Sequence, residues 1–185
     1  MNKQERAPAL PLTLSLKARN EKSSLAAQED FSNLYQTYVN PVFRYLYSRV
    51  NSAEDAEDLT SLTFLQAYRS FSTLRDQSRF APWLFIIARN KLNDFYRQRE
   101  NNTTLNSEIT AGSMPELSEV FELDERIKQL RTQIFALPEE EQELIRLRYL
   151  GELTYREIAV TLGKTEQSVK KSIYRLLARL KSQME

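Results

Sequence analysis

Apolar residues recur at steps of three and four along most of the chain, which is the spacing of one face of an α-helix. The first such run comprises Phe31, Leu34, Tyr35, Tyr38, Val42, Phe43 and Leu46. Asn40 and Pro41 lie inside this run. Because proline has no amide hydrogen to donate inside a helix, the run predicts either one kinked helix or two helices with Pro41 in a first turn.

Two more helices are predicted before residue 100. Ser52 followed by Asp55 resembles a capping box, so one helix is expected to begin there. Its apolar stripe comprises Ala56, Leu59, Thr63, Phe64, Ala67, Tyr68 and Phe71. After a polar break over residues 73–78, a further helix is expected from about Phe80 to near Arg99. Its inward face comprises Trp83, Leu84, Ile87, Ala88, Leu92 and Phe95.

The C-terminal part predicts four helices in close succession. They are a helix from Val120 to Leu137, a short helix opened by Pro138, one over residues 155–162 and one over about 166–183. Asn, Thr and Ser with Gly112 and Pro115 dominate the segment before them, which is typical of a linker. The sequence therefore predicts an all-α protein of two small helical domains (29–100 and 119–185), joined by a flexible linker (101–118) and preceded by a flexible N-terminal tail (1–28).

Residues 153–170 have the pattern of a helix-turn-helix. Thr154 with Glu157 forms a capping box that starts the first helix, and Gly163 supplies the left-handed residue that ends it. Thr165 is expected to cap the second helix, whose apolar positions are Val169, Ile173, Leu176, Leu177 and Leu180. The opposite face of that helix carries Gln167, Lys170, Lys171, Tyr174 and Arg175. This face predicts binding in the major groove of DNA; the alternative is a solvated basic face of a helical bundle.

The amino-acid composition excludes several kinds of catalytic and metal site. The 185-residue chain has no cysteine and no histidine, which excludes disulfides and imidazole catalysis and removes the commonest zinc ligands. No sequence feature calls for a cofactor, and no nucleophile is paired with a base. No apolar run approaches the roughly 20 residues of a membrane helix, and residues 10–16 are too short and too polar for a signal peptide core. A soluble, cytoplasmic protein is expected.

The net charge of +1 conceals a strong segregation of charge. Residues 54–58 form an acidic block, for which we favour compensation of the helix dipole over a carboxylate metal site. A protein-binding face is a third possibility, which the sequence alone does not separate from dipole compensation. Residues 89–99 are basic and interleaved with aromatic residues, as single-stranded nucleic acid requires. We expect Trp83 and Phe95 to pack in the core, which leaves Asn90, Asp94 and the polar loop 75–79 as the better exposed candidates.

Two separated stretches resemble one family, the extracytoplasmic-function (ECF) sigma factors of RNA polymerase, within the sigma-70 family. Residues 55–60 (DAEDLT), 63–68 (TFLQAY) and 80–90 (FAPWLFIIARN) are similar to region two of these factors. Leu137-Pro138, residues 155–159 (YREIA), Leu162-Gly163 and residues 169–175 are similar to region four. Members usually carry an acid where this chain has Leu62, and the tail is longer than the minimal pattern.

The resemblance implies an alternative sigma factor that initiates transcription of a specific regulon and is not an enzyme. It implies docking on the β′ clamp helices of core RNA polymerase through Asp55, Glu57, Asp58, Leu59 and Leu62, with the β flap as a second contact. It implies capture of −10 bases by Arg75, Ser78, Arg79, Asn90, Asp94 and Arg97. It implies binding of the −35 element by Arg148, Arg156, Gln167, Lys170, Lys171, Tyr174 and Arg175. Promoter DNA and an anti-sigma factor complete the expected partners.

Two other functions remain open at this point. One is an ordinary helix-turn-helix regulator with a helical sensing domain, which would bind duplex DNA without binding polymerase. The other is an interaction protein that has kept this fold but lost transcription, which the departure at Leu62 permits.

Overall fold

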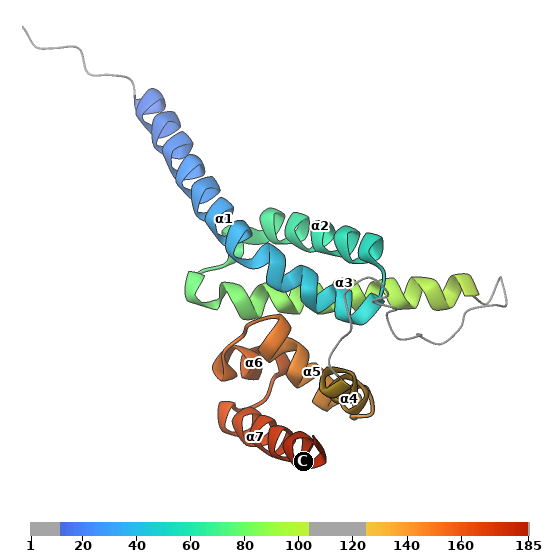
Figure 1. Cartoon of the computed structure of the whole chain (residues 1–185). Coiled ribbons are helices and arrows are strands. Elements are labelled where there is room, and N and C mark those ends of the chain that lie inside the picture. Colours follow the sequence, from blue (N-terminus) through green and yellow to red (C-terminus); the bar gives the residue numbers. More distant parts are fainter. Residues whose placement is uncertain (1–11, 104–124, 185) are drawn as a thin grey trace, which may run out of the picture. The chain divides into compact units, whose positions relative to one another are not determined.

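The computed structural model describes residues 12–103 and 125–184, with side chains described for residues 29–101 and 128–184. Every regular element in these ranges is a helix, which confirms the all-α prediction (Figure 1). The elements are α1 (Leu12–Val50), α2 (Ala53–Ser70), η1 (Phe71–Thr73), η2 (Gln77–Arg79), α3 (Phe80–Thr103), α4 (Glu125–Phe135), α5 (Glu139–Ile145), η3 (Arg146–Leu150), α6 (Tyr155–Leu162) and α7 (Glu166–Met184). Contacts divide the chain into two compact units, Met1–Thr37 and Tyr38–Glu185.

The first helix begins earlier than the apolar pattern predicts, and at Pro41 it takes one of the two forms that the sequence left open. It begins at Leu12, inside the segment predicted to be a flexible tail, because leucine, alanine, lysine and glutamine favour a helix even where no apolar stripe repeats. It also continues through Pro41 as one helix. The domain boundaries at residues 29–100 and 119–185 stay a prediction, and most of the expected linker lies outside the described residues.

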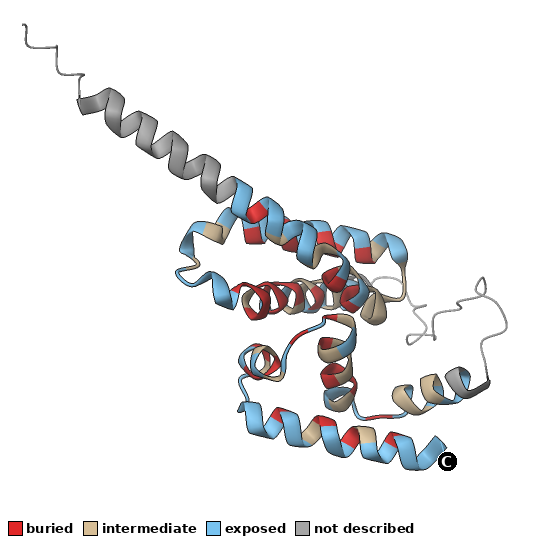
Figure 2. Cartoon of the chain, turned by 60° about the vertical axis from the view of Figure 1, so that its left-hand side comes forward, coloured by how far each residue is buried: buried red, intermediate tan, exposed pale blue. Residues whose placement is uncertain are grey.

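Within the second unit, the end of α1 packs with α2 and α3 around a shared apolar core (Figure 2). Its fully buried side chains include Val42, Tyr45, Leu46, Leu84, Phe85 and Leu92. The phase of α2 follows the predicted stripe through Ala56, Leu59, Thr63 and Phe64, but Tyr68 is 52% exposed. Tyr68 follows Ala67 by one residue, a rotation of about 100° around the helix, and so lies off the buried face.

The remaining helices of this unit form a second core. Leu144, Leu147, Leu153, Ile158, Val169, Ile173, Leu176 and Leu180 are buried between α5, η3, α6 and α7. The predicted inward positions of α7 are therefore confirmed, with Leu177 only partly buried. The helix predicted after Pro138 begins at Glu139, also as expected.

Candidate nucleic-acid interface

The helix-turn-helix begins at a complete capping box. The backbone amide of Thr154 donates to the Glu157 carboxylate at 2.8 Å, and the Glu157 amide donates to Thr154 Oγ1 at 3.3 Å. Gly163 ends α6 in the left-handed conformation, with φ of 64°. The Ser168 amide then donates to Thr165 Oγ1 at 3.2 Å, which caps the start of α7. These local contacts confirm the predicted turn and fix the direction in which α7 leaves it.

The outer face of α7 carries five predicted DNA contacts. Gln167, Lys170, Lys171, Tyr174 and Arg175 are all exposed. Val169 and Ile173 point the other way and are each 1% exposed. The expected separation into a buried face and a basic face is therefore present.

A row of rings and cations joins α7 to the helices before it. The Lys170 ammonium lies 5.9 Å from the centroid of the Tyr174 ring, and that ring lies 6.2 Å from the ring of Tyr155. The Arg148 guanidinium lies over the Tyr155 ring, 5.1 Å from its centroid. Tyr155 was not among the predicted site residues, because sequence spacing alone does not show that residues 155 and 174 meet. Its ring packs against the exposed side chain of Tyr174.

Arg148 and Arg156, the two further arginines predicted to bind the −35 element, differ in exposure to solvent. Arg156 is exposed. Arg148 is partly buried and donates from Nη1 to the carbonyl oxygen of Leu153 at 2.8 Å. It therefore holds the turn that precedes α6, and its side chain is less exposed than that of Arg156.

The polar loop before α3 is organised by Asp76. This carboxylate accepts hydrogen bonds from the amide of Ser78 at 3.0 Å and from its hydroxyl at 2.6 Å. These bonds from the Ser78 side chain and amide hold the pKa of Asp76 below its usual value, with a smaller contribution from Arg79. The predicted residues Arg75, Ser78 and Arg79 are exposed around it. Asp76 was missed because an acid in a DNA-binding loop has no direct attraction to phosphate.

Three further −10 candidates share one face of α3. Asn90 and Arg97 are exposed, Asp94 is partly buried, and Arg97 donates to Asp94 at 2.8 Å. Asn90 lies ten residues beyond the first residue of α3, a distance of about 15 Å along the helix. The loop and these three residues thus form two groups, one at the start of α3 and one near its middle.

Trp83 and Phe95 are partly buried rather than fully in the core. Trp83 packs beside the buried Phe80 ring, with 5.8 Å between the ring centroids.

The predicted core-polymerase face of α2 needs one correction. Leu59 is 3% exposed, because it shares the inward phase of Ala56 and Thr63, and its side chain does not reach the surface. Asp55 is partly buried and lies 3.6 Å from Arg99, while its amide donates to Ser52 Oγ at 3.2 Å, so the predicted cap is present. Glu57 and Asp58 are exposed as expected.

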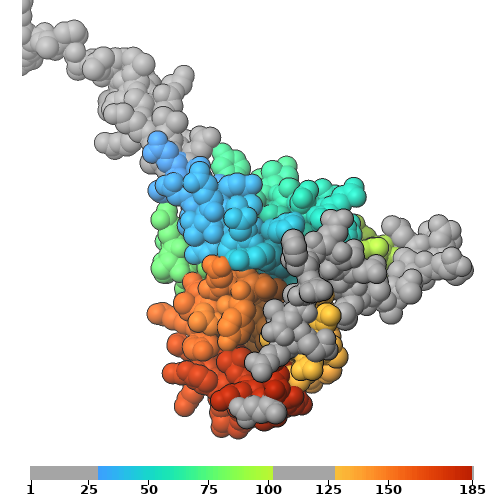
Figure 3. All heavy atoms as spheres, viewed as in Figure 1, coloured from blue at the N-terminus to red at the C-terminus, as the bar shows by residue number. Residues whose placement is uncertain are grey.

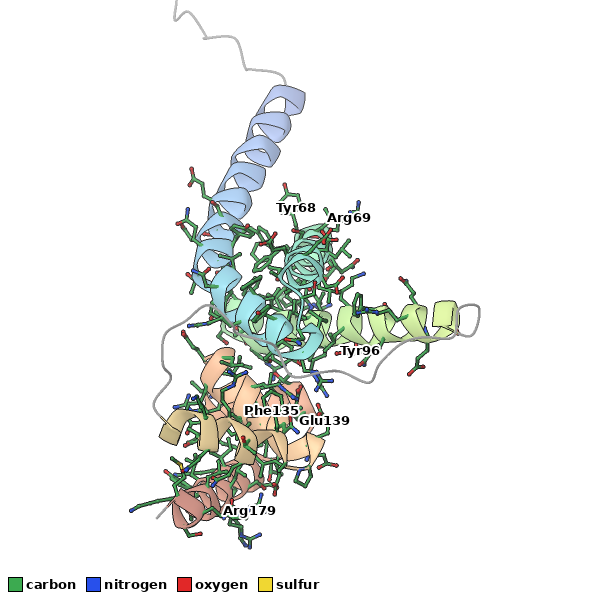
Figure 4. The ribbon with its side chains drawn as sticks, turned by 45° about the vertical axis from the view of Figure 1, so that its right-hand side comes forward. Tyr68, Arg69, Tyr96, Phe135, Glu139 and Arg179 are labelled. Carbon is green, nitrogen blue, oxygen red and sulfur yellow. The ribbon has the colours of Figure 1, made fainter. Side chains whose placement is uncertain are left out.

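An exposed apolar stripe that includes Leu62 lies on the same helix. Leu62, Leu65 and Tyr68 are 48%, 45% and 52% exposed, and steps of three residues place them on adjoining turns. Tyr68 and Arg69 project from the outer side of α2 (Figure 4). Leu65 and Tyr68 were not among the predicted contacts.

Among the described residues, no group of three or more aspartate and glutamate side chains is arranged to hold a metal ion. None of the described helices is both long and apolar enough to cross a membrane.

Comparison with known proteins decides the family. The sigma-70 region 2 family model matches residues 34–102, and the sigma-70 region 4 model matches residues 127–180. The ECF RNA polymerase sigma factor SigM of Bacillus subtilis is 31% identical over 150 residues, which cover 80% of this chain and 91% of SigM. The chain belongs to the ECF group of the sigma-70 family.

A second relative and a solved structure are also sigma factors. The ECF sigma factor BldN of Streptomyces coelicolor is 34% identical over 168 residues, covering 86% of this chain, and the chain spans 62% of BldN. The solved structure of the sigma factor RpoE in complex with the anti-sigma factor NepR from Bartonella quintana has a TM-score of 0.62 at 22% identity. It covers 83% of this chain and 96% of RpoE, and shows the same fold. The protein is thus an alternative sigma factor, a regulatory subunit that binds core RNA polymerase and promoter DNA to direct initiation.

Proposed function

We propose that this sigma factor reads the −35 element with the outer face of α7. The observation that carries the proposal is the exposed row Gln167, Lys170, Lys171, Tyr174 and Arg175, held by a capped helix-turn-helix. Early residues of such a helix reach base edges, and flanking cations bind phosphates. Arg156 adds a further cation for phosphates, whereas Arg148 contributes mainly by positioning Tyr155.

The −10 element is assigned to the start and middle of α3. Arg75, Ser78 and Arg79 surround the loop that Asp76 organises, and Asn90, Asp94 and Arg97 share one face of the helix. Capturing an unpaired base needs polar groups in a fixed position, because unstacking the base costs a few kcal/mol. The bonds that Asp76 makes to Ser78 supply such a fixed loop.

Docking on the β′ clamp helices is assigned to the exposed side of α2. Glu57, Asp58 and Leu62 remain from the predicted set, and Leu65 and Tyr68 extend the face. Leu59 is left out because it is buried, and Asp55 contributes less because it is paired with Arg99. The β flap is the expected second contact on polymerase.

The protein is expected to act in the cytoplasm as a binding subunit and not as an enzyme. An anti-sigma factor is a further expected partner, since the similar RpoE was solved with NepR.

Run-off transcription with purified core polymerase is the test of these assignments. A library of fragments is selected for promoters that are active only when the protein is added. Specific initiation supports the assignment and reveals both promoter elements. Failure to bind core polymerase would favour an ordinary DNA-binding regulator, and binding without initiation would favour an interaction protein.

A charge reversal tests the α2 face separately. Asp58→Lys is expected to weaken binding to core polymerase at least about tenfold. A surface complementary to the acidic Asp58 is positively charged, and the lysine would be repelled by it. Glu100→Lys, at an exposed position of α3, is the matched control and should bind normally. Equal binding by both variants would remove α2 from the docking face.

A further inference from the structure

Glu143 lies at the centre of contacts between helices that are far apart in the sequence. It belongs to α5, is 7% exposed, and accepts a hydrogen bond at 2.9 Å from the hydroxyl of Tyr45 in α1. Arg89 of α3 places Nε 3.0 Å from Glu143 Oε1, and Arg49 of α1 places Nη1 3.5 Å from Oε2. The partners of this buried carboxylate thus come from helices that precede residue 100.

Three more polar contacts link residues before position 100 to residues after position 138. Arg49 also pairs with Glu139 at the start of α5, and Arg89 donates to the carbonyl oxygen of Thr161 in α6 at 3.2 Å. Arg44 pairs with Glu152 in the turn before α6. Glu139 of α5 and Tyr96 of α3 lie on the sides of the two helix groups that face each other (Figure 4). All three contacts join the helices of region two to those of region four.

The two groups of helices also pack closely at Gly151. A Cβ atom added to Gly151 would lie 2.7 Å from Cε1 of Phe85, a fully buried ring of α3. The backbone of Gly151 has an ordinary φ of −80°, so the glycine is needed here for close approach and not for its conformation. Atoms of residues near 150–160 lie directly against the helices before residue 100 (Figure 3).

The interface is nevertheless one that can separate. Ion pairs and hydrogen bonds of Arg44, Tyr45, Arg49 and Arg89 cross it. Beside Glu143 lies a cavity of about 300 Å³ whose lining includes Asn93, Glu140 and Lys164. The region-four helices also have an apolar cluster of their own around Leu137, Leu176 and Leu180. Interfaces of this polar kind are typical of domains that move relative to one another.

We propose that Glu143 acts as a latch in the free protein. Its ion pairs with Arg49 and Arg89 hold the region-two helices against the region-four helices, and we call this arrangement the closed state. Arg89 directly precedes Asn90 in the basic stretch of α3. While the latch is closed, both guanidinium groups neutralise a carboxylate of the same chain and are withheld from DNA. Opening releases Arg49 together with Arg89, which is next to the −10 candidate Asn90, a consequence that rests on the proposed function.

The closed state is tested on the free protein without polymerase or promoter. The chain has no cysteine, so Gln66→Cys on α2 and Ser182→Cys on α7 give a unique pair of exposed spin-label sites. Double electron–electron resonance should show one narrow distance distribution for the otherwise unchanged chain. A broad distribution would overturn the closed state and leave the proposed function standing.

Two variants test the latch by independent routes. Glu143→Gln removes the charge that holds the arginines, and Gly151→Ala drives a methyl group into the Phe85 ring. Both should broaden the distance distribution towards longer distances while the helical circular dichroism is retained. Glu141→Gln is the matched control, because Glu141 pairs with Arg179 inside the region-four helices. An unchanged distribution in both test variants, or equal broadening in the control, overturns the latch.

Binding of single-stranded DNA tests the consequence. We expect Glu143→Gln to bind an oligonucleotide roughly tenfold more tightly than the unchanged chain at low salt, since two additional phosphates are neutralised. Glu141→Gln changes the net charge equally and should show a much smaller gain. Equal gains in the two variants would show that only net charge matters. A broadened distance distribution without a gain in affinity would overturn this consequence, because the released arginines would then not face DNA.

Discussion

Val169 and Lys170 are neighbours in the chain with opposite environments. Val169 is 1% exposed, whereas Lys170 is exposed and lies near the ring of Tyr174. Because adjacent helical residues are about 100° apart, one position serves the core and the next faces solvent. Substitution of each residue therefore tests a different property of α7.

Lys170→Ala is expected to weaken promoter binding without loss of stability. Removal of one phosphate contact should reduce the salt slope of duplex binding by about 1. Fluorescence anisotropy with a selected promoter at several salt concentrations measures this change, and thermal unfolding should be unaltered. Val169→Ala should instead destabilise the fold by about 2 kcal/mol. A lower melting temperature for Lys170→Ala with normal promoter binding would contradict the assigned face.

Tyr155→Ala is expected to weaken binding of the −35 element although Tyr155 is not assigned a base contact. Its ring contacts both Arg148 and Tyr174, and such aromatic contacts contribute about 1 kcal/mol, or roughly fivefold in affinity. Tyr155→Phe keeps the ring and should retain affinity. If both substitutions weaken binding equally, the hydroxyl and not the ring is responsible. Affinity for a duplex lacking the −35 element serves as the baseline.

Single residues were predictable where position on a helix decides their environment. The outward direction of Lys171 and Arg175 follows from spacing alone. Asp76 and Glu143 were not predictable as organising residues, because their partners are set by loop geometry and by contacts across the chain. Leu59 was misplaced because the resemblance covers a whole helix, whose inner and outer faces carry different functions.

At the scale of elements, the turn between α6 and α7 depends on one glycine. Gly163 has φ of 64°, and a Cβ atom there would meet nothing within 4 Å. Any penalty for alanine therefore comes from the backbone conformation and not from a clash.

Gly163→Ala is expected to destabilise the protein by about 1 kcal/mol, the cost of a left-handed conformation for a residue with a side chain. Urea unfolding measures the difference. Gly163→Asn should lose less, because asparagine tolerates this conformation better. An alanine variant as stable as the unchanged chain would show that the turn adopts another conformation in solution.

Elements with local signals were predicted well. The caps at Ser52, Thr154 and Thr165 lie within a few residues of their partners, so the sequence contains the whole interaction. The start of α1 was missed because its first turns have helical propensity without a repeating apolar face. Propensity and burial are separate signals, and the prediction relied on burial.

At the scale of the whole molecule, sequence predicted two helical parts but not the contacts between region two and region four. Those contacts join residues far apart in the sequence, such as Tyr45 with Glu143 and Arg89 with Glu143, and no local pattern reports such pairs. Their most deeply buried donor is Tyr45, which is 1% exposed. Burial, followed by the charge of Glu143 and the hydrogen bond to it, raises the pKa of Tyr45 well above its usual value.

The raised pKa of Tyr45 predicts a specific loss of stability in alkali. Above pH 10 the unfolded chain releases the tyrosine proton, while the folded chain retains it. The folded state then binds more protons, so the free energy of unfolding falls as pH rises, by up to about 1.4 kcal/mol per pH unit for this group. Below pH 10 the contribution is complete and does not change with pH.

Tyr45→Phe isolates this contribution. At pH 7 the variant should be less stable by about 2 kcal/mol, because the Glu143 carboxylate loses a hydrogen-bond donor. Urea unfolding between pH 8 and pH 11 should show this deficit shrinking above about pH 10, since phenylalanine has no proton to lose. Tyr68→Phe, at an exposed position, is the control for the substitution itself. A deficit that stays constant to pH 11 would mean that the Tyr45 hydroxyl reaches water, and that the contact with Glu143 is open in solution.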